Sequence, residues 1–298
     1  PRYFYFLSSD GKPIAIALGF QGLYSNPLIS FWKKNFWMDS LPVFDSKATN
    51  LNDVLRAIEI QLRREGNVEL LIGSFASYGG VNELAKLRFT ITDRVEFKIC
   101  LKQSEEELWK NFQGRCRTAI RKAKKAGVKI IGLPDDRAVN ELRRLQSETS
   151  ERILQRGGPQ LVVKMNHTHD TLNILLSSNY GRILCASLNG KIVSSVFLTY
   201  FNGIAYYTFA GHSQEGLETQ APSFLVWEAI RKYREEGAKT FNLGGVKATA
   251  IEKGSPEHGV YVYKKGFGGN CIICHSGKKI IHKIRHRIFN FGKYILSR

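Results

Sequence analysis

Residues 181–211 read GRILCASLNGKIVSSVFLTYFNGIAYYTFAG, the stretch of the chain that is most informative about its fold. It contains three runs of alternating apolar and polar residues, rich in β-branched and aromatic side chains, which is typical of half-buried strands. The runs meet at Asn189-Gly190 and at Asn202-Gly203. These dipeptides supply the positive φ angles of two-residue hairpin turns. The sequence therefore predicts an antiparallel meander of three strands.

The segment after the meander predicts a helix and then another strand. Residues 221–237, APSFLVWEAIRKYREEG, carry apolar side chains at helical spacing and end in Gly237, a helix stop signal. Residues 239–245, KTFNLGG, predict the strand. Three antiparallel strands, a helix and a strand in this order resemble the core of the GNAT acyltransferase fold.

The rest of the chain also alternates strands and helices. Ser104 and Glu107 form a capping box that opens a basic helix, and Gly127 ends it. A glycine-rich segment, GVYVYKKGFGG, leads into the short apolar run NCIICH near the C-terminus. Further strands are predicted over residues 3–7, 14–20 and 68–74, and further helices over residues 51–66, 135–156 and 168–178.

Both halves of the chain share a plan of strands, helix and strand, so we expect a mixed α/β (α+β) fold with two GNAT-like domains. Each domain has a mixed, mainly antiparallel sheet flanked by helices, and the two surround a shared cleft. The expected bounds are residues 1–130 for the first domain, which ends in the basic helix, residues 131–276 for the second, and residues 277–298 for a basic amphipathic tail.

Composition excludes several classes of protein. With 298 residues, of which 43% are hydrophobic and 11% aromatic, the chain can bury real cores, which excludes disordered, collagen-like and coiled-coil proteins. It contains no run of eighteen apolar residues, so no transmembrane helix is predicted. Five cysteines are an odd number, which does not support a disulfide framework and favours a reducing compartment. We therefore expect a cytoplasmic protein.

The positive charge of the chain is concentrated in two stretches. Lys and Arg number 44 against 26 Asp and Glu, a net charge of +18. Residues 110–129 carry eight Lys and Arg and residues 271–298 carry seven, and neither stretch contains an acid. Each run taken alone also fits a solvated helix face. Together they predict a partner rich in phosphate or anionic head groups.

Three motifs carry a specific resemblance. They are LWKNFQGRCRTAIRKAKKAGVKI (108–130), APSFLVWEAIRKYREEGAKTFNLGG (221–245) and HGVYVYKKGFGG (258–269). In this order they resemble the FemABX family, the aminoacyl-tRNA-dependent transferases of peptidoglycan cross-bridge synthesis. The resemblance implies an aminoacyl-tRNA donor and an amine acceptor on a lipid- or nucleotide-linked envelope precursor. The product is an amide.

The resemblance also implies roles for individual residues. The family places a lysine directly after an aromatic residue at the reacting centre, where it stabilises the oxyanion of the tetrahedral intermediate, and Lys264 is the matching position. His258 is an acid/base candidate close to it in sequence. Basic side chains on the helix after residue 108 could contact phosphates. The expected substrate-binding residues are Arg115, Arg117, Arg121, Lys122, Tyr263, Lys265, Gly266, Phe267, Gly268 and His258.

Departures from the family pattern keep two other functions open. Cys100 and Asn242 stand where the family often has Asp, which indicates a different acceptor. An acyl-CoA-dependent N-acyltransferase of an amino sugar or amino acid is the first alternative. The turn before the helix at 221 speaks against it, because Leu217 stands where a pyrophosphate-binding Gly belongs and Pro222 lacks an N–H. A non-catalytic RNA- or membrane-binding protein is the second. No bound cofactor or metal is expected.

The C-terminal residues 278–298, KKIIHKIRHRIFNFGKYILSR, interleave apolar residues with cations. Such a segment can lie on an anionic membrane surface, which would suit a lipid-linked acceptor. It can equally form a helix that docks on the body of the protein with its basic face in water. We therefore expect a cytoplasmic location, with peripheral association at the inner face of the membrane as the alternative that the tail leaves open.

Overall fold

The computed structural model describes residues 1–22, 31–73, 80–155 and 169–296. The chain forms two compact units, Pro1–Arg94 together with Ile273–Arg298, and Val95–Ile272. It passes between them within two long strands, β6 (Thr90–Cys100) and β12 (Asn270–Ile280). These units do not coincide with the domains expected from the sequence. The basic helix, expected in the first domain, belongs to the second unit, and the tail belongs to the first unit. The boundaries between the units lie inside β6 and β12 and not in linkers.

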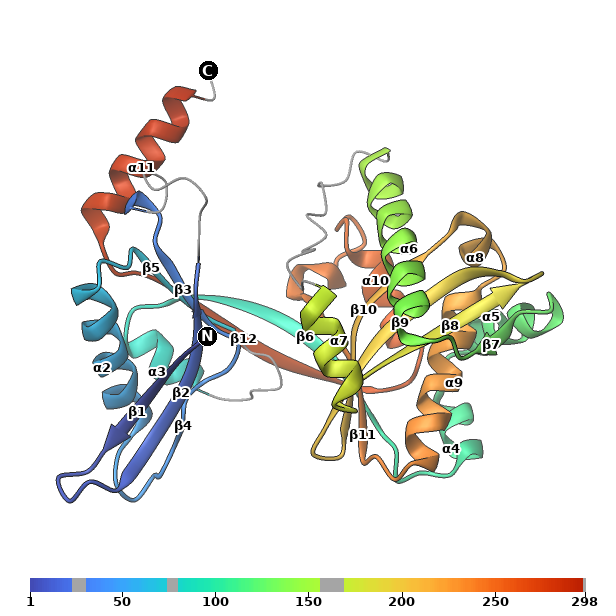
Figure 1. Ribbon diagram of the computed structural model, residues 1–298, viewed down its shortest axis with the longest axis horizontal. Coiled ribbons are helices and arrows are strands. Elements are labelled where there is room, and N and C mark those ends of the chain that lie inside the picture. Colours follow the sequence, from blue (N-terminus) through green and yellow to red (C-terminus); the bar gives the residue numbers. More distant parts are fainter. Residues whose placement is uncertain (23–30, 74–79, 156–168, 297–298) are drawn as a thin grey trace. The chain divides into compact units, whose positions relative to one another are not determined.

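The first unit is a sheet covered by helices. Its strands follow the order β1-β2-β3-β5-β12, with β4 on β2, and β3 and β5 are its parallel pair (Figure 1). Helix α2 begins because Asn50 accepts a hydrogen bond from the Asp53 N–H, and it buries one apolar face that includes Leu55 and Ile58. Besides parts of β6 and β12, the elements of this unit are β1 (Arg2–Leu7), β2 (Pro13–Gln21), β3 (Asn35–Met38), β4 (Val43–Phe44), α2 (Leu51–Arg64), β5 (Glu69–Ile72), α3 (Val81–Lys86) and α11 (Lys283–Leu296).

The second unit contains the predicted meander. Strands β8 (Gly181–Leu188), β9 (Lys191–Phe201) and β10 (Ile204–His212) are antiparallel neighbours. Asn189-Gly190 and Asn202-Gly203 form the two turns with positive φ at all four residues, as predicted. The sheet continues in the order β6-β11-β10-β9-β8-β7. Its other elements are α4 (Glu105–Asn111), α5 (Gly114–Lys125), β7 (Lys129–Ile131), α6 (Asp135–Gln155), α7 (His169–Ser177), α8 (Gln214–Glu218), α9 (Ala221–Glu235), β11 (Thr240–Lys247) and α10 (His258–Lys265).

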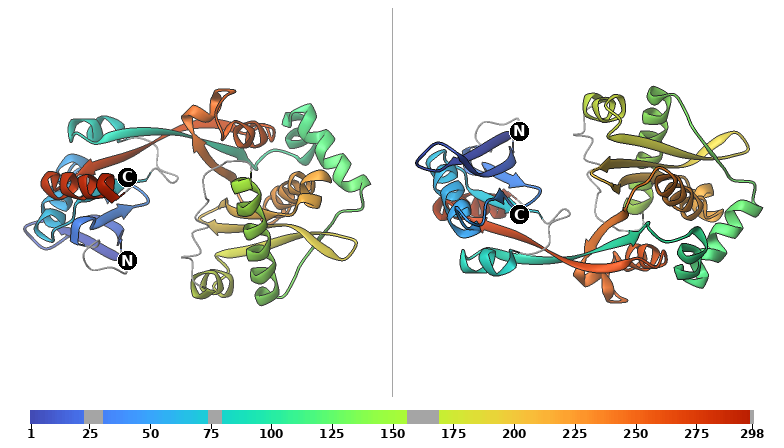
Figure 2. Two further views of the ribbon diagram at one scale, coloured as in Figure 1. Left: turned by 90° about the horizontal axis from the view of Figure 1, so that it is seen from above. Right: turned by 90° about the horizontal axis from the view of Figure 1, so that it is seen from below.

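Helices cover both faces of this sheet. Leu184 and Ala186 point into a core shared with α5 and α9, whereas Ile183 and Cys185 point into a second core shared with α6 and α7. Figure 2 shows these helix pairs on opposite sides of the strands. Strands β8 and β9 of the meander, expected to be half-buried, are therefore buried on both faces. The mixed α/β class and the GNAT order of meander, helix and strand are confirmed.

One local prediction differs from the structure. The basic helix expected to run from Ser104 to Gly127 is two helices, because the backbone of Phe112 is extended and its side chain turns into the core, 1% exposed. The capping box at Ser104 is confirmed. The glycine-rich segment holds helix α10, which ends at Gly266. Within the described part of the chain, no helix is long and apolar enough to cross a membrane.

Candidate functional site

Lys264 lies at a fork between two parallel strands. β10 pairs with β11 through only three residue pairs, the last being Tyr206 with Asn242, although both strands continue. Lys264, in the last turn of α10, donates a hydrogen bond from Nζ to the Gly245 carbonyl oxygen at 3.2 Å. The same Nζ lies 6.0 Å from the centre of the Tyr207 ring. A positive charge is thus held just beyond the point where strand pairing ends.

The backbone conformation at residue 244 requires the first glycine of the Leu243-Gly244-Gly245 motif. The φ of Gly244 is +70°, a conformation that favours glycine. A Cβ at this position would lie 3.3 Å from the Tyr207 carbonyl oxygen and 3.5 Å from Lys264 Nζ. The glycine therefore lets β11 approach both β10 and the lysine amine.

Aromatic side chains anchor the end of α10. Phe267 is 1% exposed and packs edge-to-face on both Phe112 and Tyr263, with ring centres 5.3 and 5.4 Å apart. The hydroxyl oxygen of Tyr263 is buried. Burial, the largest cause, raises the pKa of Tyr263 well above its usual value of 10, so the phenol stays neutral. Tyr263 and Phe267, both predicted substrate contacts, support Lys264 by packing.

The basic side chains of α5 make contacts within the protein. Arg115 donates from Nη2 to the Val262 carbonyl oxygen at 2.8 Å, which ties α5 to α10. Arg117 donates from Nη1 to the carbonyl oxygens of Lys110, at 3.0 Å, and Phe112, at the C-terminal end of α4. Phosphate binding by these two residues stays a prediction, although both guanidinium groups already have partners.

The other two predicted phosphate contacts are more open to solvent. Arg121 is exposed and lies over the Trp109 ring, 5.4 Å from its centre. Lys122 is exposed beside it in the sequence. Their role in phosphate binding also stays a prediction.

The remaining predicted residues lie at both ends of α10. His258, in the first turn, hydrogen-bonds through Nδ1 to the Ala250 carbonyl oxygen at 3.0 Å, so a neutral ring carries its proton on Nδ1. Lys265 is exposed over the Tyr261 ring, and Gly266 accepts a hydrogen bond from the Gln113 N–H at 2.8 Å. At Gly268, a Cβ would lie 2.1 Å from the Asn111 carbonyl oxygen. The close approach that requires this glycine is therefore to the chain's own backbone.

Sequence reasoning missed a buried polar pair beside the fork. Glu96 on β6 and Asn242 on β11 are both 0% exposed. Asn242 donates from Nδ2 to Glu96 Oε2 at 2.9 Å and accepts a hydrogen bond from the Gly244 N–H at 2.8 Å. The predicted loss of a carboxylate at Asn242 is thus accompanied by a carboxylate from a neighbouring strand. Cys100, the other departure from the family pattern, is exposed.

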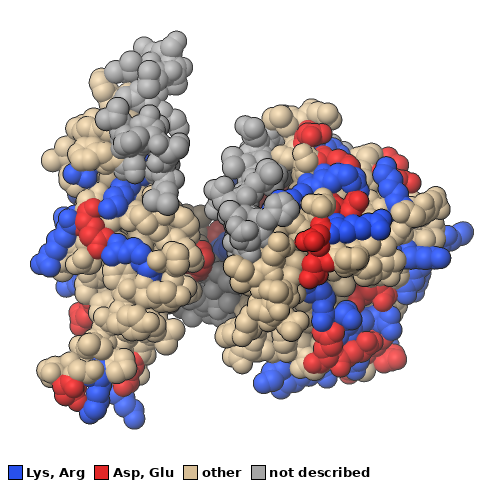
Figure 3. All heavy atoms as spheres, in the orientation of Figure 1, with Lys and Arg blue, Asp and Glu red and all other residues tan. Residues whose placement is uncertain are grey.

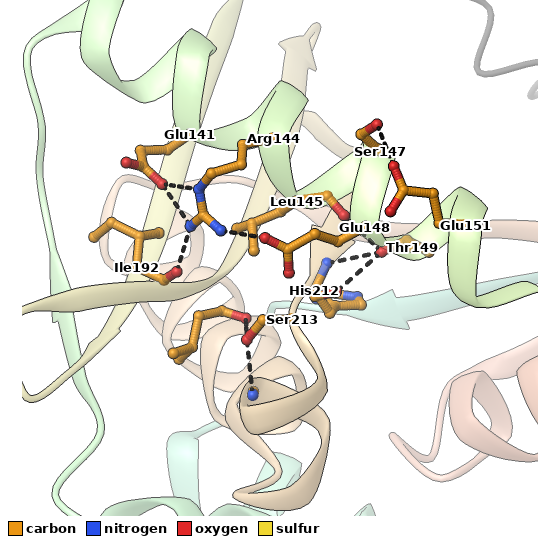
Figure 4. Close-up of polar contacts among 12 residues, drawn as sticks. Glu141, Arg144, Leu145, Ser147, Glu148, Thr149, Glu151, Ile192, His212 and Ser213 are labelled. Carbon is orange, nitrogen blue, oxygen red and sulfur yellow. Dashed lines mark hydrogen bonds and ion pairs between the residues drawn. The ribbon is translucent and has the colours of Figure 1, made fainter.

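The turn from β10 to α9 is filled by the protein itself. Ser213 caps the short helix α8 by accepting a hydrogen bond from the Gly216 N–H at 3.0 Å (Figure 4). Residues Ala221 and Ser223, in the first turn of α9, are 0% and 4% exposed. The backbone N–H groups that hold a pyrophosphate in such a turn must be accessible. This helix start therefore gives no support to a standard coenzyme A site.

Helix α6 is fastened beside this turn. Thr149 accepts a hydrogen bond from the His212 N–H at 3.0 Å, and Arg144 binds Glu141 at 2.7 Å, Glu148, and the Ile192 carbonyl oxygen at 2.7 Å (Figure 4). Over the second unit, acidic and basic side chains lie next to one another on the face that Figure 3 shows. The charge of α6 is thus largely compensated locally.

His212 makes stability depend on pH. Its ring hydrogen-bonds to Ser194, which is 0% exposed, and burial lowers its pKa from 6.5 to about 4, with a smaller effect of Arg152. Between these two pKa values only the unfolded state binds the proton. The contribution of the neutral His212 to the free energy of unfolding is therefore fully present above pH 6.5 and is lost as the pH falls to 4. We expect wild type to lose about 3 kcal/mol more than His212→Asn between pH 7 and pH 4 in urea unfolding. Equal losses would contradict this assignment.

Comparisons with known proteins show which families and folds the chain resembles. The family model described as an acetyltransferase (GNAT) domain matches residues 110–265, just over half of the chain. The chain belongs to the GNAT acetyltransferase family. A second family model, the FemAB family, matches residues 65–154 of this GNAT protein and confirms the resemblance to FemABX proteins. The two matches together indicate an acyltransferase that resembles FemAB proteins over residues 65–154.

Solved structures with the same fold cover nearly the whole GNAT protein. The crystal structure of FemX has a TM-score of 0.71 at 14% identity and covers 96% of this chain and 89% of its own. The C-terminal DUF2156 domain of a protein from Agrobacterium fabrum, described as a lysylphosphatidylglycerol synthetase, has a TM-score of 0.59 at 14% identity, with 99% and 89% covered. L-PGS from Bacillus licheniformis has a TM-score of 0.58 at 12% identity, with 100% and 89% covered. No curated protein sequence matches the chain.

Proposed function

We propose that this protein transfers an aminoacyl group from aminoacyl-tRNA to an amine of a cell-envelope precursor. The amine nitrogen attacks the ester carbonyl carbon, a C–N bond forms, and the C–O bond to the tRNA ribose breaks. The proton lost by the amine leaves with the ribose oxygen. The observation that supports this proposal is the ammonium group of Lys264, held on the Gly245 carbonyl at the fork of β10 and β11.

Lys264 acts electrostatically in this proposal. Aminolysis of an ester is downhill, so the enzyme must mainly align the reactants and stabilise the oxyanion that develops on the carbonyl oxygen. A fixed ammonium group stabilises this oxyanion. His258 lies six residues earlier on α10, about 9 Å along the helix axis. His258 is therefore separated from the group that Lys264 stabilises.

Two observations favour aminoacyl-tRNA over acyl-CoA as donor. The start of α9, where coenzyme A would place its pyrophosphate, is buried, with Ala221 0% and Ser223 4% exposed. The net charge of +18 includes exposed cations on α5, such as Arg121 and Lys122, that suit a phosphate backbone. The resemblance to FemABX proteins, supported by the FemAB family match over residues 65–154, favours the same donor by analogy.

The donor is tested directly. The purified protein is incubated with radiolabelled aminoacyl-tRNA pools or with labelled acetyl-CoA, and crude envelope precursors serve as acceptor. We expect label to move to the acceptor from aminoacyl-tRNA only, with tRNA binding that weakens steeply as salt rises. Transfer only from acetyl-CoA would replace this donor with the alternative one. No transfer from either, together with tRNA or membrane binding, would indicate a binding protein.

The tail supports peripheral membrane association as part of this proposal. Helix α11 docks on the first unit through Arg285, whose Nη1 donates to the Gly66 carbonyl oxygen at 3.2 Å. Three apolar side chains, Ile284, Ile288 and Phe291, recur at helical spacing and are 68%, 47% and 66% exposed. An exposed apolar stripe between cations fits the surface of an anionic bilayer, where a lipid-linked acceptor would lie.

Vesicle binding checks the tail. Ile284→Ser with Phe291→Ser should reduce co-sedimentation with phosphatidylglycerol vesicles severalfold, because the apolar stripe is lost. The matched control is Ile60→Ser, since Ile60 is 53% exposed on α2 of the same unit. Equal binding to phosphatidylglycerol and phosphatidylcholine vesicles, or no difference between the variants, would rule the surface out.

A further inference from the structure

We infer that Glu96 is a positioning residue of the Lys264 site and that it acts through Asn242. This inference rests on the proposed role of Lys264. It begins from three consecutive hydrogen bonds in the second unit. Glu96 accepts from Asn242 at 2.9 Å, Asn242 accepts from the Gly244 N–H at 2.8 Å, and the next residue, Gly245, accepts from Lys264 Nζ at 3.2 Å.

The carboxylate of Glu96 fixes the orientation of the Asn242 amide. An asparagine side chain donates from Nδ2 and accepts at Oδ1, and its two ends differ little in shape. Glu96 Oε2 accepts from the Nδ2 end, and Oδ1 is then turned toward the Gly244 N–H. The Gly244 N–H can only donate, so it also selects Oδ1, and the two contacts together hold the amide in one orientation.

The oriented amide shapes the strand end at which Lys264 is held. Asn242 is the last residue of β11 that pairs with β10. Its Oδ1 binds the N–H two residues ahead, an Asx-type contact that bends the backbone. Gly244 follows with φ at +70°, and Gly245 then directs its carbonyl oxygen at the lysine amine. The direction of that carbonyl therefore depends on the Asn242 side chain.

Glu96 works from the opposite face of the sheet. Phe97, the next residue on β6, packs on Tyr261 of α10 with ring centres 5.6 Å apart. Side chains alternate along a strand, so Glu96 points to the other face. The pKa of Tyr206, which pairs with Asn242, is raised by burial and by the negative charge of Glu96. Glu96 thus acts on the site through the backbone that Asn242 bends.

A swap of the two side-chain types tests this chain of contacts. Glu96→Gln removes the fixed polarity, and Asn242→Asp sets two buried carboxylates against each other. We expect each single variant to lower kcat about 10-fold with little change in KM, because Lys264 is misplaced. In the double variant, the amide introduced on β6 donates to the carboxylate introduced on β11, which still accepts from the Gly244 N–H. This variant should recover kcat to within about 3-fold of wild type.

A second readout separates this inference from the proposed function. The rate at which a lysine-specific acylating reagent labels Lys264, followed by mass spectrometry, should change in both single variants and return in the double variant. Changed labelling with unchanged transfer would keep the positioning role and refute the catalytic role of Lys264. Unchanged labelling in folded single variants, or a double variant no better than the singles, would overturn the inference.

Discussion

Replacing Lys264 with alanine is expected to lower kcat about 100- to 1,000-fold and to leave KM within a few-fold of wild type. The reason is that the lysine charge is held on the Gly245 carbonyl at the fork of β10 and β11 before substrate binds. A charge placed where the oxyanion develops stabilises the transition state more than the bound ester. Steady-state transfer from aminoacyl-tRNA to the acceptor measures both constants.

Two further variants make the result specific. Lys264→Arg keeps the charge but presents a planar fork, so it should retain an intermediate rate. Lys232→Ala removes a lysine of α9 whose 3.5 Å ion pair with Glu236 is partly exposed, and it should leave transfer unchanged. A Lys264→Ala enzyme that keeps wild-type kcat would contradict the electrostatic role. A loss seen only in KM would instead place Lys264 in substrate binding.

Local signals predicted the central part of the fold. Asn189-Gly190 and Asn202-Gly203 specify their turns because the required φ angles strain most other residues. The helix after the meander follows from apolar spacing together with Gly237, which has a φ of +81°. These elements are determined by residues close together in the chain, and a single sequence contains that information.

The helix break at Phe112 depended on distant residues. The sequence from Ser104 to Gly127 contains no proline, and its only interior glycine is Gly114. Helix α4 ends at Phe112 because the Phe112 ring packs between Trp227 and Phe267, which are distant from it in the sequence. Tertiary packing of this kind overrides local helix propensity.

The candidate site was only partly predictable for the same reason. Lys264 was identified through a motif, whereas Glu96 is a single acid in the alternating run RVEFKIC. Alternation predicts that Glu96 lies on the face opposite Val95 and Phe97. It does not tell whether that face is covered, and a solvent-exposed glutamate is the ordinary expectation. The hydrogen bond to Asn242 joins residues 146 positions apart, so only the folded structure reveals it.

Helix charge gave a similarly incomplete picture. The run of cations on α5 predicted a phosphate-binding face, yet Arg117 closes the carbonyl end of α4. A sequence shows how many cations a helix carries but not which carbonyl oxygens their guanidinium groups bind. The described contacts therefore divide the stretch into residues that fasten helices, such as Arg115 and Arg117, and exposed ones, such as Arg121 and Lys122.

The second large effect concerns Gly268, four residues after Lys264. Gly268→Ala should reduce the free energy of unfolding by about 3 to 4 kcal/mol. Part of this loss is the cost of a side chain at a φ of +68°. The larger part is a Cβ that would lie 2.1 Å from the Asn111 carbonyl oxygen, a backbone atom at the end of α4 that cannot move aside alone.

Gly127→Ala is the matched control because it places a side chain at a positive φ angle but creates no steric clash. Gly127 has a φ of +82° and no atom within 4 Å of an added Cβ, so its loss should be about 1 kcal/mol. Urea unfolding of both variants measures the difference. Equal losses would mean that α4 shifts to admit the methyl group, and that the contact of Gly268 with α4 is not what fixes the end of α10. A difference of about 2 kcal/mol or more would show that this contact holds the segment bearing Lys264 against α4.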